Sequence, residues 1–204
     1  MALRSPILLL WMVESLAAAT RILSARRNRQ LRVVVILRAP GRTRAQLLDA
    51  IGLHGPALDA LDVEFGVNSA DHEVDMPLEL FVEQALSAGA RWIQVPERET
   101  EPWSALKASV HVIRSCHDLT GLDEALSKGA SFCTLSPIFP TPSKSGHLGL
   151  GVDALFEATS KYPGRVLPLG GVSPSRWGLL ASTGVNGVAT IRHGADWLAF
   201  DDAL

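Results

Sequence analysis

The sequence has little of what proteins that bind nucleic acids or membranes need. Charged residues make up 20% of the 204 residues, the formal net charge is −2, and neither a basic block nor an acidic tail occurs. We therefore expect no nucleic acid partner held by broad electrostatics. The apolar run near the start, residues 6–13, is far shorter than the roughly 20 residues that span a bilayer. We expect no membrane partner either.

Cysteine and histidine are too scarce and too scattered to suggest a metal site. Cys116 and Cys133 are the only cysteines, they lie within or beside apolar runs, and their spacing matches no metal motif. We expect two reduced thiols in a cytoplasmic protein, with one disulfide between them as the alternative. The six histidines are dispersed and no two have the i,i+4 spacing of helical ligands, so we expect no metal built from histidines.

The N-terminal stretch "MALRSPILLLWMVESLAAAT" loosely resembles a signal peptide, because an early arginine precedes a short apolar run and small residues. Glu14 interrupts the run directly before the alanines at which cleavage would fall. This interruption favours a buried first strand, and a signal sequence is the alternative.

Short apolar runs alternate with amphipathic segments of helical period along the whole chain. Three of these segments end in glycine before the next run, at Gly89, Gly129 and Gly184, as helix C-caps do. Continuous apolar strands separated by helices indicate a parallel sheet covered on both faces. The eight runs are residues 7–13, 33–37, 63–67, 92–95, 110–113, 132–135, 166–170 and 187–191.

Eight such units without a linker predict an α/β fold, a compact TIM (β/α)8 barrel formed as a single domain by residues 1–204. A doubly wound sheet is the alternative. A hydrophobic content of 47% is sufficient for a real core in a chain of this length. The weakest stretch is residues 52–62, "GLHGPALDALD", which carries poor helix signals.

Polar residues and glycines gather where the predicted strands end, which is where a TIM barrel carries its chemistry. The strands themselves are apolar, so this concentration indicates a site. We take Arg38, Asn68 and Thr190 as candidate substrate-binding residues on this ground. The strand ends in chain order are Arg38, Asn68, Pro96 with Glu97, Ser115 with His117, the loop 136–151, Gly170 with Gly171, and Thr190 with Arg192 and His193.

The stretch "LPLGGVSP" predicts a phosphate site. Gly170 and Gly171 would let backbone N–H groups approach an anion, and Ser173 and Pro174 would begin a helix whose N-terminus adds partial positive charge. Barrels often bind phosphate at the loops after strands seven and eight. A tight turn chosen for packing is the alternative.

The loop "SPIFPTPSKSGHLGLG" would cover the same region. Thr141 and Ser143 offer hydroxyl donors and Lys144 offers a positive charge, while three prolines stiffen the backbone. A stiff loop loses less entropy when it closes on a ligand. The alternative is a loop that is only rigid surface. In "VIRSCHD", His117 follows an apolar strand, and an ordinary pKa near 6.5 suits it to proton transfer, although a structural role is the alternative.

The segments "RSCHD", "SPIFPTPSKSG", "PLGGVSP" and "GVATI", in this order and spacing, resemble thiamine phosphate synthase and its TenI-like relatives. The resemblance is specific over about residues 110–192 and diffuse before them. It implies a compact TIM barrel in which these loops bind the thiazole phosphate and the diphosphate. The residues that match the binding positions are Ser115, Thr141, Ser143, Lys144, Gly170 and Gly171, with serine in place of the loop's second threonine.

The N-terminal half departs from the synthase pattern where that pattern binds diphosphate and magnesium. Of the Gln-x-Arg-x-Lys motif only Arg38 is present, and Ser69 stands where an aspartate would hold magnesium. The fourth strand ends in "IQVPER" without the motif's aspartate, and the nearby Glu97 and Glu99 miss the motif position. We therefore expect no metal and no other cofactor, unless the chain is a synthase, which would need magnesium.

The phosphate cup and His117 resemble the TenI-like pattern, in which the histidine of a Ser-x-His motif is associated with thiazole tautomerisation. The favoured hypothesis is an isomerase of thiamine biosynthesis that acts on a phosphorylated carboxythiazole. Arg38 would pair with the substrate carboxylate, and a structural ion pair at the barrel mouth is the alternative for this residue. One alternative is thiamine phosphate synthase, a transferase that joins thiazole phosphate to pyrimidine diphosphate. Another is a non-catalytic protein that binds thiazole phosphate or thiamine phosphate.

Tryptophans are candidates for a homo-oligomer interface. Trp103, Trp177 and Trp197 fall in segments expected to be helical. A core face of those helices is the alternative explanation.

Overall fold

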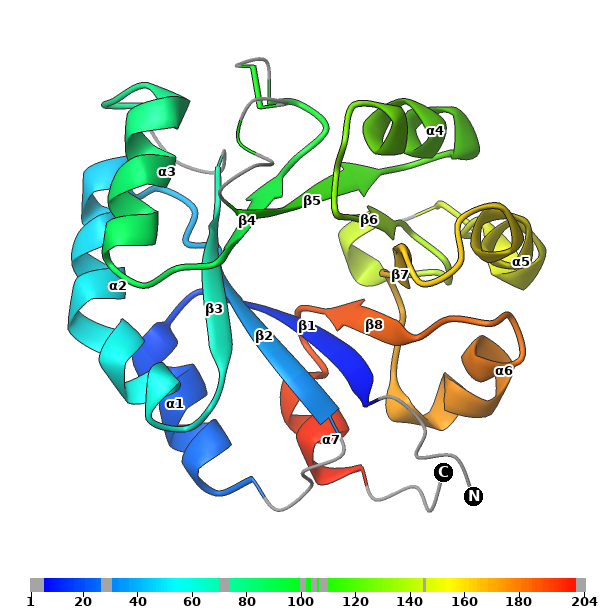
Figure 1. The fold of residues 1–204 in the computed structure, drawn as a ribbon. Helices are drawn as coiled ribbons and strands as arrows, with labels where there is room; N and C mark the ends of the chain where they lie inside the picture. Colours follow the sequence, from blue (N-terminus) through cyan, green and yellow to red (C-terminus); the bar gives the residue numbers. More distant parts are fainter. Residues whose placement is uncertain are drawn as a thin grey trace.

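Parallel strands form one curled sheet at the centre of the molecule (Figure 1). The computed structural model describes residues 6–26, 31–69, 74–99, 102–103, 106, 110–144 and 146–200. Within them the sheet has eight strands in the order β7-β6-β5-β4-β3-β2-β1-β8. The strands are β1 (Ile7–Val13), β2 (Leu31–Leu37), β3 (Glu64–Asn68), β4 (Trp92–Val95), β5 (His111–Cys116), β6 (Phe132–Leu135), β7 (Val166–Pro168) and β8 (Gly187–Thr190).

The strand order identifies a barrel, not a doubly wound sheet. From β1 to β7 each strand pairs in parallel with the next one in the chain, and β1 pairs with β8. A doubly wound sheet would instead reverse its order at a switch point. Strands β7 and β8 lie side by side without a ladder between their described residues, so the barrel is nearly closed (Figure 1). The predicted TIM-barrel-like fold is confirmed.

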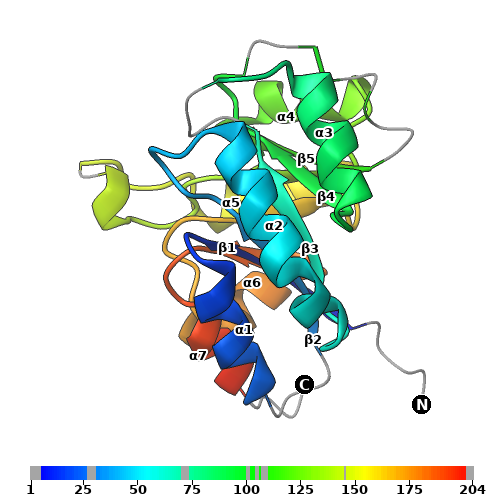
Figure 2. The same ribbon diagram turned by 90° about the vertical axis from the view of Figure 1, so that its left-hand side faces the viewer.

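Helices cover the outside of this barrel (Figures 1 and 2). They alternate with the strands, as the apolar pattern predicted, except that the described residues between β4 and β5 contain no α-helix. The α-helices are α1 (Leu16–Ser24), α2 (Arg44–Asp59), α3 (Leu78–Ser87), α4 (Leu119–Ser127), α5 (Gly151–Lys161), α6 (Trp177–Ala181) and α7 (Gly194–Ala199), and two 3₁₀ turns are η2 (Pro142–Lys144) and η3 (Pro174–Arg176).

The strands bury both of their faces, which explains their continuous apolar sequences. One core lies between the strands and the helices, and a smaller one fills the barrel itself. At the N-terminal ends of the strands, the Trp92 indole lies inside the barrel and donates a hydrogen bond to Glu64 (Nε1 to Oε2, 2.8 Å), which also pairs with Arg32 at 2.7 Å. The inner core comprises Leu8, Leu10, Met12, Val34, Ile36, Trp92, Ile113, Leu167 and Ala189.

The N-terminal apolar run forms β1, in the position of a buried first strand. It pairs with both β2 and β8 and is almost entirely buried. Among the described residues no helix has the length and apolar character needed to cross a membrane.

The predicted helix ends and the packing of the tryptophans are largely confirmed. Gly89, Gly129 and Gly184 follow α3, α4 and α6 with φ of 98°, 94° and 81°, a conformation that glycine adopts without strain. Trp177 and Trp197 are buried and meet edge to face, so they belong to the core and not to an exposed interface. Trp103 is buried as well, but it lies in the loop after β4 and not in a helix as expected.

The weak helix signals in residues 52–62 were misleading, because α2 continues to Asp59. The helix begins with a capping box between Thr43 and Gln46, which satisfies orphan N–H groups at its first turn. Gly55 allows the helix to approach the Phe65 ring closely, since a Cβ there would lie 2.7 Å from the ring. Tertiary packing therefore outweighs the poor propensity of glycine and proline. The buried face is Arg44, Leu47, Ile51, Gly55 and Leu58.

Replacing Gly66 by alanine should severely destabilise the barrel. Gly66 pairs with Trp92, and a Cβ at Gly66 would collide with the main-chain carbonyl of Trp92, which cannot rotate away. We expect Gly66→Ala to lower the free energy of unfolding by about 3 kcal/mol or more, measured by urea denaturation.

Gly52→Ala is the matched control. Gly52 lies on the exposed side of α2, and a Cβ added there would have no neighbouring atom within 4 Å. We expect this change to raise the free energy of unfolding by about 0.5–1 kcal/mol. Equal effects of the two substitutions would contradict the close approach of β3 and β4.

Candidate functional site

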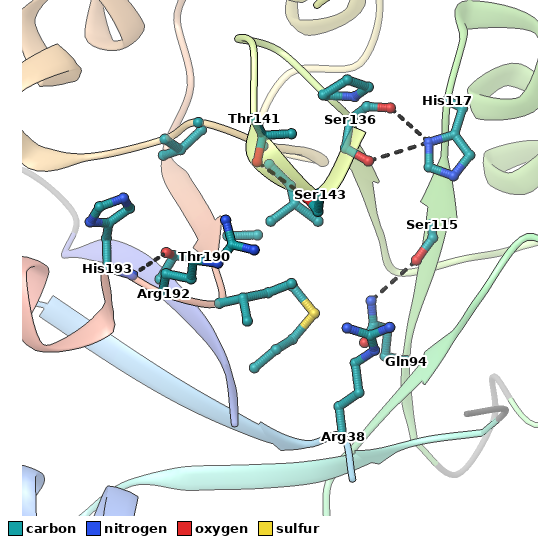
Figure 3. A pocket seen from close by; sticks show the side chains of 18 of the residues that line it. Arg38, Gln94, Ser115, His117, Ser136, Thr141, Ser143, Thr190, Arg192 and His193 are labelled. Carbon is teal, nitrogen blue, oxygen red and sulfur yellow. Dashed lines mark hydrogen bonds between the residues drawn. The ribbon is translucent and has the colours of Figure 1, made fainter. Parts of the chain in front are cut away.

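A cavity of about 860 Å³ opens at the C-terminal ends of the strands. Nearly every predicted site residue lines it, although they come from six strand ends that are far apart in the sequence (Figure 3). Lys144 is the exception, because only its backbone, in η2, belongs to the described structure. The predicted residues that line the cavity are Arg38, Asn68, Ser115, His117, Thr141, Ser143, Gly170, Gly171 and Thr190.

The loop between β6 and α5 forms one wall of the cavity. Its first residues continue alongside the end of β7, since the N–H groups of Ile138 and Phe139 donate to the carbonyls of Leu169 (2.9 Å) and Gly170 (3.0 Å). The Ser136–Pro137 peptide bond at its start is cis. The tip of the loop, yellow-green in Figure 2, stands out from the barrel and brings the hydroxyls of Thr141 and Ser143 within 3.2 Å of each other.

Gly170 and Gly171 are required for the packing of this loop. Their φ angles are 88° and 66°, and a Cβ on Gly170 would lie 2.7 Å from Pro137. A Cβ on Gly171 would lie equally close to Phe139. The tight-turn explanation of the glycine pair therefore holds, and it is compatible with anion binding. In the described structure, no protein acceptor takes a hydrogen bond from the N–H groups of Gly170 and Gly171, which line the cavity.

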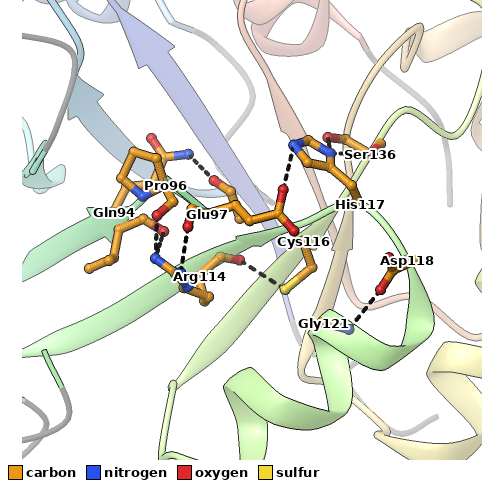
Figure 4. A network of polar contacts seen from close by, with 11 residues as sticks. Gln94, Pro96, Glu97, Arg114, Cys116, His117, Asp118, Gly121 and Ser136 are labelled. Atoms are coloured by element: carbon orange, nitrogen blue, oxygen red, sulfur yellow. Dashed lines mark hydrogen bonds and ion pairs between the residues drawn. The ribbon is translucent and has the colours of Figure 1, made fainter. Parts of the chain in front are cut away.

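His117 lies at the end of β5, beside the start of this loop, with its ring held in one orientation (Figure 4). Its Nδ1 is 2.7 Å from the Ser136 carbonyl oxygen and 3.3 Å from the Ser136 hydroxyl. A carbonyl can only accept, so Nδ1 carries the proton of that hydrogen bond. The other nitrogen, Nε2, lies 3.6 Å from the carboxylate of Glu97. Nε2 is therefore the ring atom that can exchange a proton with a ligand.

Arg114 determines the position of Glu97. It donates hydrogen bonds to the carbonyls of Pro96 and Glu97 (Figure 4). Its guanidinium also lies over the Trp103 ring, 5.7 Å from the ring centroid. These contacts hold the backbone after β4 against β5. The carboxylate of Glu97 remains half-exposed at the mouth of the cavity, beside His117.

Gln94 is a site residue that the sequence did not reveal. Its amide connects two predicted residues: Asn68 Nδ2 donates to Gln94 Oε1 at 2.9 Å, and Gln94 Nε2 donates to Ser115 Oγ at 3.1 Å. All three side chains line the cavity. The available signal was the single polar residue in the otherwise apolar strand "WIQV", because an inward-facing amide must find partners.

Glu99 is committed to a buried ion pair. Its carboxylate accepts from Arg44 at 3.3 Å and from the Ser69 hydroxyl at 2.9 Å, and the Arg44 side chain has no exposed surface. The Arg44 guanidinium also donates to the carbonyls of Ser69 (3.1 Å) and Met76 (2.7 Å). These contacts join α2, the end of β3 and the segment before α3 behind the cavity wall.

This ion pair and the contacts of Glu97 bear on the magnesium that the synthase resemblance implies. A cation at the end of β3 would compete with the Arg44 guanidinium for Glu99, and Ser69 is a weaker ligand than the aspartate it replaces. Glu97 faces His117 instead. In the part of the chain that the structure describes, no three His, Cys, Asp or Glu side chains gather as a metal site would require. The described donors therefore do not fit magnesium.

Cationic side chains outnumber carboxylates around the cavity. The carboxylates are Glu14 and Glu97, whereas arginines come from several strand ends. Arg176 donates to the Gly171 carbonyl and lies 4.4 Å above the Phe139 ring, so it also fixes the loop. Such a surface attracts an anionic ligand. The arginines that line the cavity are Arg38, Arg98, Arg176 and Arg192.

The two cysteines are free thiols packed between the strands and the helices. A hydrogen bond with Cys133, together with burial, raises the pKa of the Cys116 thiol far above its ordinary value. A neutral, buried thiol is a poor nucleophile. Cys116 is therefore not part of the chemistry, although it is next to His117 in the chain.

The fold and the cavity define a barrel with one cationic, polar pocket at its strand ends, suited to a small anionic molecule. Residues 101–193, just under half of the chain, match the family model described as thiamine monophosphate synthase (TMP-TENI). The C-terminal part of the chain is thus similar to the thiamine monophosphate synthase/TenI family, and this match does not separate the branches of the family.

Two curated relatives carry related names. A protein of Geobacter sulfurreducens named "Putative thiamine-phosphate synthase" is 34% identical over 114 residues, which are 54% of this chain and 54% of that protein. "Putative thiamine-phosphate synthase 2" of Aquifex aeolicus is 31% identical over 109 residues, 52% of this chain and 59% of that protein. The chain thus spans little more than half the length of the curated relatives it matches.

A solved structure shares the fold. Thiamine phosphate pyrophosphorylase from Pyrococcus furiosus superimposes with a TM-score of 0.72, covering 93% of this chain and 88% of that one. The sequences are 18% identical, so this likeness concerns the barrel alone.

Removing the charge of Glu99 should destabilise the protein strongly. In Glu99→Gln the Arg44 guanidinium stays buried without a counter-charge, so we expect the free energy of unfolding to fall by about 3–5 kcal/mol. Glu97→Gln, two positions earlier, is the control: its half-exposed pair with His117 should contribute about 0–1 kcal/mol. Chemical denaturation of both variants measures the difference. A loss below about 1 kcal/mol in Glu99→Gln would show that the buried pair does not hold the wall.

Proposed function

We propose that the protein is an enzyme of thiamine biosynthesis in the thiamine phosphate synthase/TenI family, and that it is a TenI-like thiazole tautomerase. Its substrate would be a phosphorylated carboxythiazole. The observation that carries this proposal is the histidine at the end of β5: His117 is oriented by Ser136 and presents Nε2 to a cationic cavity. A proton shift needs an anchor and one acid/base group, and no diphosphate site.

The phosphate of the substrate would bind where the glycine turn faces the loop after β6. The N–H groups of Gly170 and Gly171 and the hydroxyls of Thr141 and Ser143 are donors there, and Lys144 would add a positive charge. Backbone and hydroxyl donors held by a packed loop need little reorganisation when an anion binds. Arg38, which reaches the cavity from the end of β2, would pair with the substrate carboxylate.

His117 would perform the proton transfer through Nε2. It removes a proton from a ring carbon of the thiazole and returns a proton to the exocyclic carbon, so the composition of the substrate is unchanged. The hydrogen bond from Nδ1 to the Ser136 carbonyl keeps the ring in place and stabilises the charged imidazolium between the two steps. Glu97 lies 3.6 Å from Nε2, at the same edge of the ring.

Two other functions have support of their own. A synthase is favoured by the names of the family and of the curated relatives, and by the Pro-Thr-Pro-Ser-Lys loop. Against it stand Glu99, which Arg44 neutralises, and Ser69 in place of an aspartate. A non-catalytic protein that binds thiazole phosphate or thiamine phosphate would use the same anion donors and would not need His117.

Replacing His117 by alanine should abolish tautomerisation and preserve binding. We expect kcat to fall by about 10²–10⁴-fold, because general acid/base catalysis contributes that much, with the Kd for thiazole phosphate changed less than about threefold. Substrate conversion is followed by NMR, and binding by calorimetry. His54→Ala is the control, since His54 lies on α2 and does not line the cavity.

The same samples separate the alternatives. Incubation of the wild-type protein with thiazole phosphate, pyrimidine diphosphate and magnesium tests for diphosphate release. Release with retained rates in His117→Ala would establish the synthase. Binding without either reaction would leave a non-catalytic protein.

A further inference from the structure

A line of three polar side chains crosses the floor of the cavity from β3 to β5. Asn68 and Gln94 are almost fully buried, and Ser115 is half-buried. They are joined by two hydrogen bonds, one of 2.9 Å between Asn68 and Gln94. The other joins Gln94 and Ser115 at 3.1 Å (Figure 3). Buried amides in an apolar barrel are retained only where their hydrogen bonds are satisfied.

The two hydrogen bonds run in one direction. The Asn68 amide donates to Gln94 Oε1, which leaves the Gln94 amide nitrogen facing Ser115. That nitrogen carries hydrogens and no free lone pair, so Ser115 Oγ must accept. The hydroxyl hydrogen of Ser115 then points elsewhere, and no side chain or carbonyl in the described structure accepts it. A hydroxyl of this kind is a donor directed at whatever occupies the cavity.

The position of Ser115 on its strand gives this donor a function. Residues two apart on a strand face the same side, so Ser115 and His117 both face the cavity, while Cys116 packs into the outer core. A ligand atom that accepts from Ser115 is therefore held on the His117 side of the cavity. The Ser115 hydroxyl would fix which part of the ligand meets Nε2.

We propose that Gln94 is a positioning residue that makes Ser115 an obligate hydrogen-bond donor, so that the site selects ligands with an unprotonated acceptor at that point. The identity of the ligand rests on the proposed function. For a phosphorylated carboxythiazole, the acceptor is the ring nitrogen of the thiazole or an oxygen of its carboxylate. Gln94 does not touch the reacting atoms. It acts through Ser115, and the phosphate is bound elsewhere, at the glycine turn.

Gln94→Glu tests the proposal because it keeps the shape of the side chain but exchanges donor and acceptor in the hydrogen bond with Ser115. The carboxylate still accepts from Asn68, but it also accepts from Ser115, whose hydroxyl then turns away from the ligand. We expect the Kd for thiazole carboxylate phosphate to rise by about tenfold, the loss of one hydrogen bond, relative to the Kd for inorganic phosphate. The ratio of the two constants removes any general effect of the added charge. In kinetics, KM should rise more than kcat falls.

Two further variants complete the binding experiment. Gln94→Met removes the amide without adding charge and should give a smaller rise in the same ratio. Ser115→Ala should reproduce the rise of Gln94→Glu, and the double variant should add nothing more, because both changes remove one donor. Additive effects, or an unchanged ratio in Gln94→Glu, would overturn the proposal.

The direction of the hydrogen bonds can be read without any ligand. In NMR spectra, one side-chain NH₂ hydrogen of Gln94 should move and exchange faster with water in Ser115→Ala, since it loses its acceptor. If instead the Gln94 hydrogens are unaffected, Oε1 faces Ser115 and the proposal is wrong. Should the Gln94 signal move while the wild-type protein binds no thiazole phosphate, the proposed function fails and the role of Gln94 stands.

Discussion

The pocket depends on the contact between the loop that follows β6 and the turn that follows β7. Backbone hydrogen bonds from Ile138 and Phe139 continue the pairing of β6 with β7 beyond the last ladder residues. The approach is so close that Gly170 and Gly171 have no room for side chains. One packing constraint thus extends the β6–β7 wall towards the mouth and presents the N–H groups of the two glycines to the cavity at the strand ends.

A second constraint holds the other side of the pocket, where the contact is made by charge and not by backbone. Arg44 and Glu99 join α2 to the strand ends β3 and β4 through a pair that is shielded from water. Two opposite charges that satisfy each other inside the protein leave neither available for a ligand. Glu99 therefore adds no negative charge to the pocket, in whose lining the arginines outnumber the carboxylates Glu14 and Glu97.

Much of this arrangement could be predicted from the sequence, for physical reasons. The eight apolar runs reflect strands buried on both faces, and the glycines after helices reflect positions with a positive φ. Both requirements are local, so the barrel and the residues at its strand ends could be predicted from the sequence. Gln94, the Arg44–Glu99 pair and the helical state of residues 52–59 could not be predicted. Each depends on a partner distant in the chain, such as Ser115 for Gln94 or Phe65 for Gly55, and no local pattern records such a partner.

The Trp92 indole at the far end of the barrel limits the routes by which a ligand can enter and leave the cavity. The indole fills the barrel interior at that end and is hydrogen-bonded to Glu64. The cavity is therefore closed at the N-terminal ends of the strands. A ligand enters and leaves at the other end, at the strand-end mouth to which the loop tip contributes Thr141 and Ser143. Substrate and product therefore share one route, past the C-terminal ends of the strands.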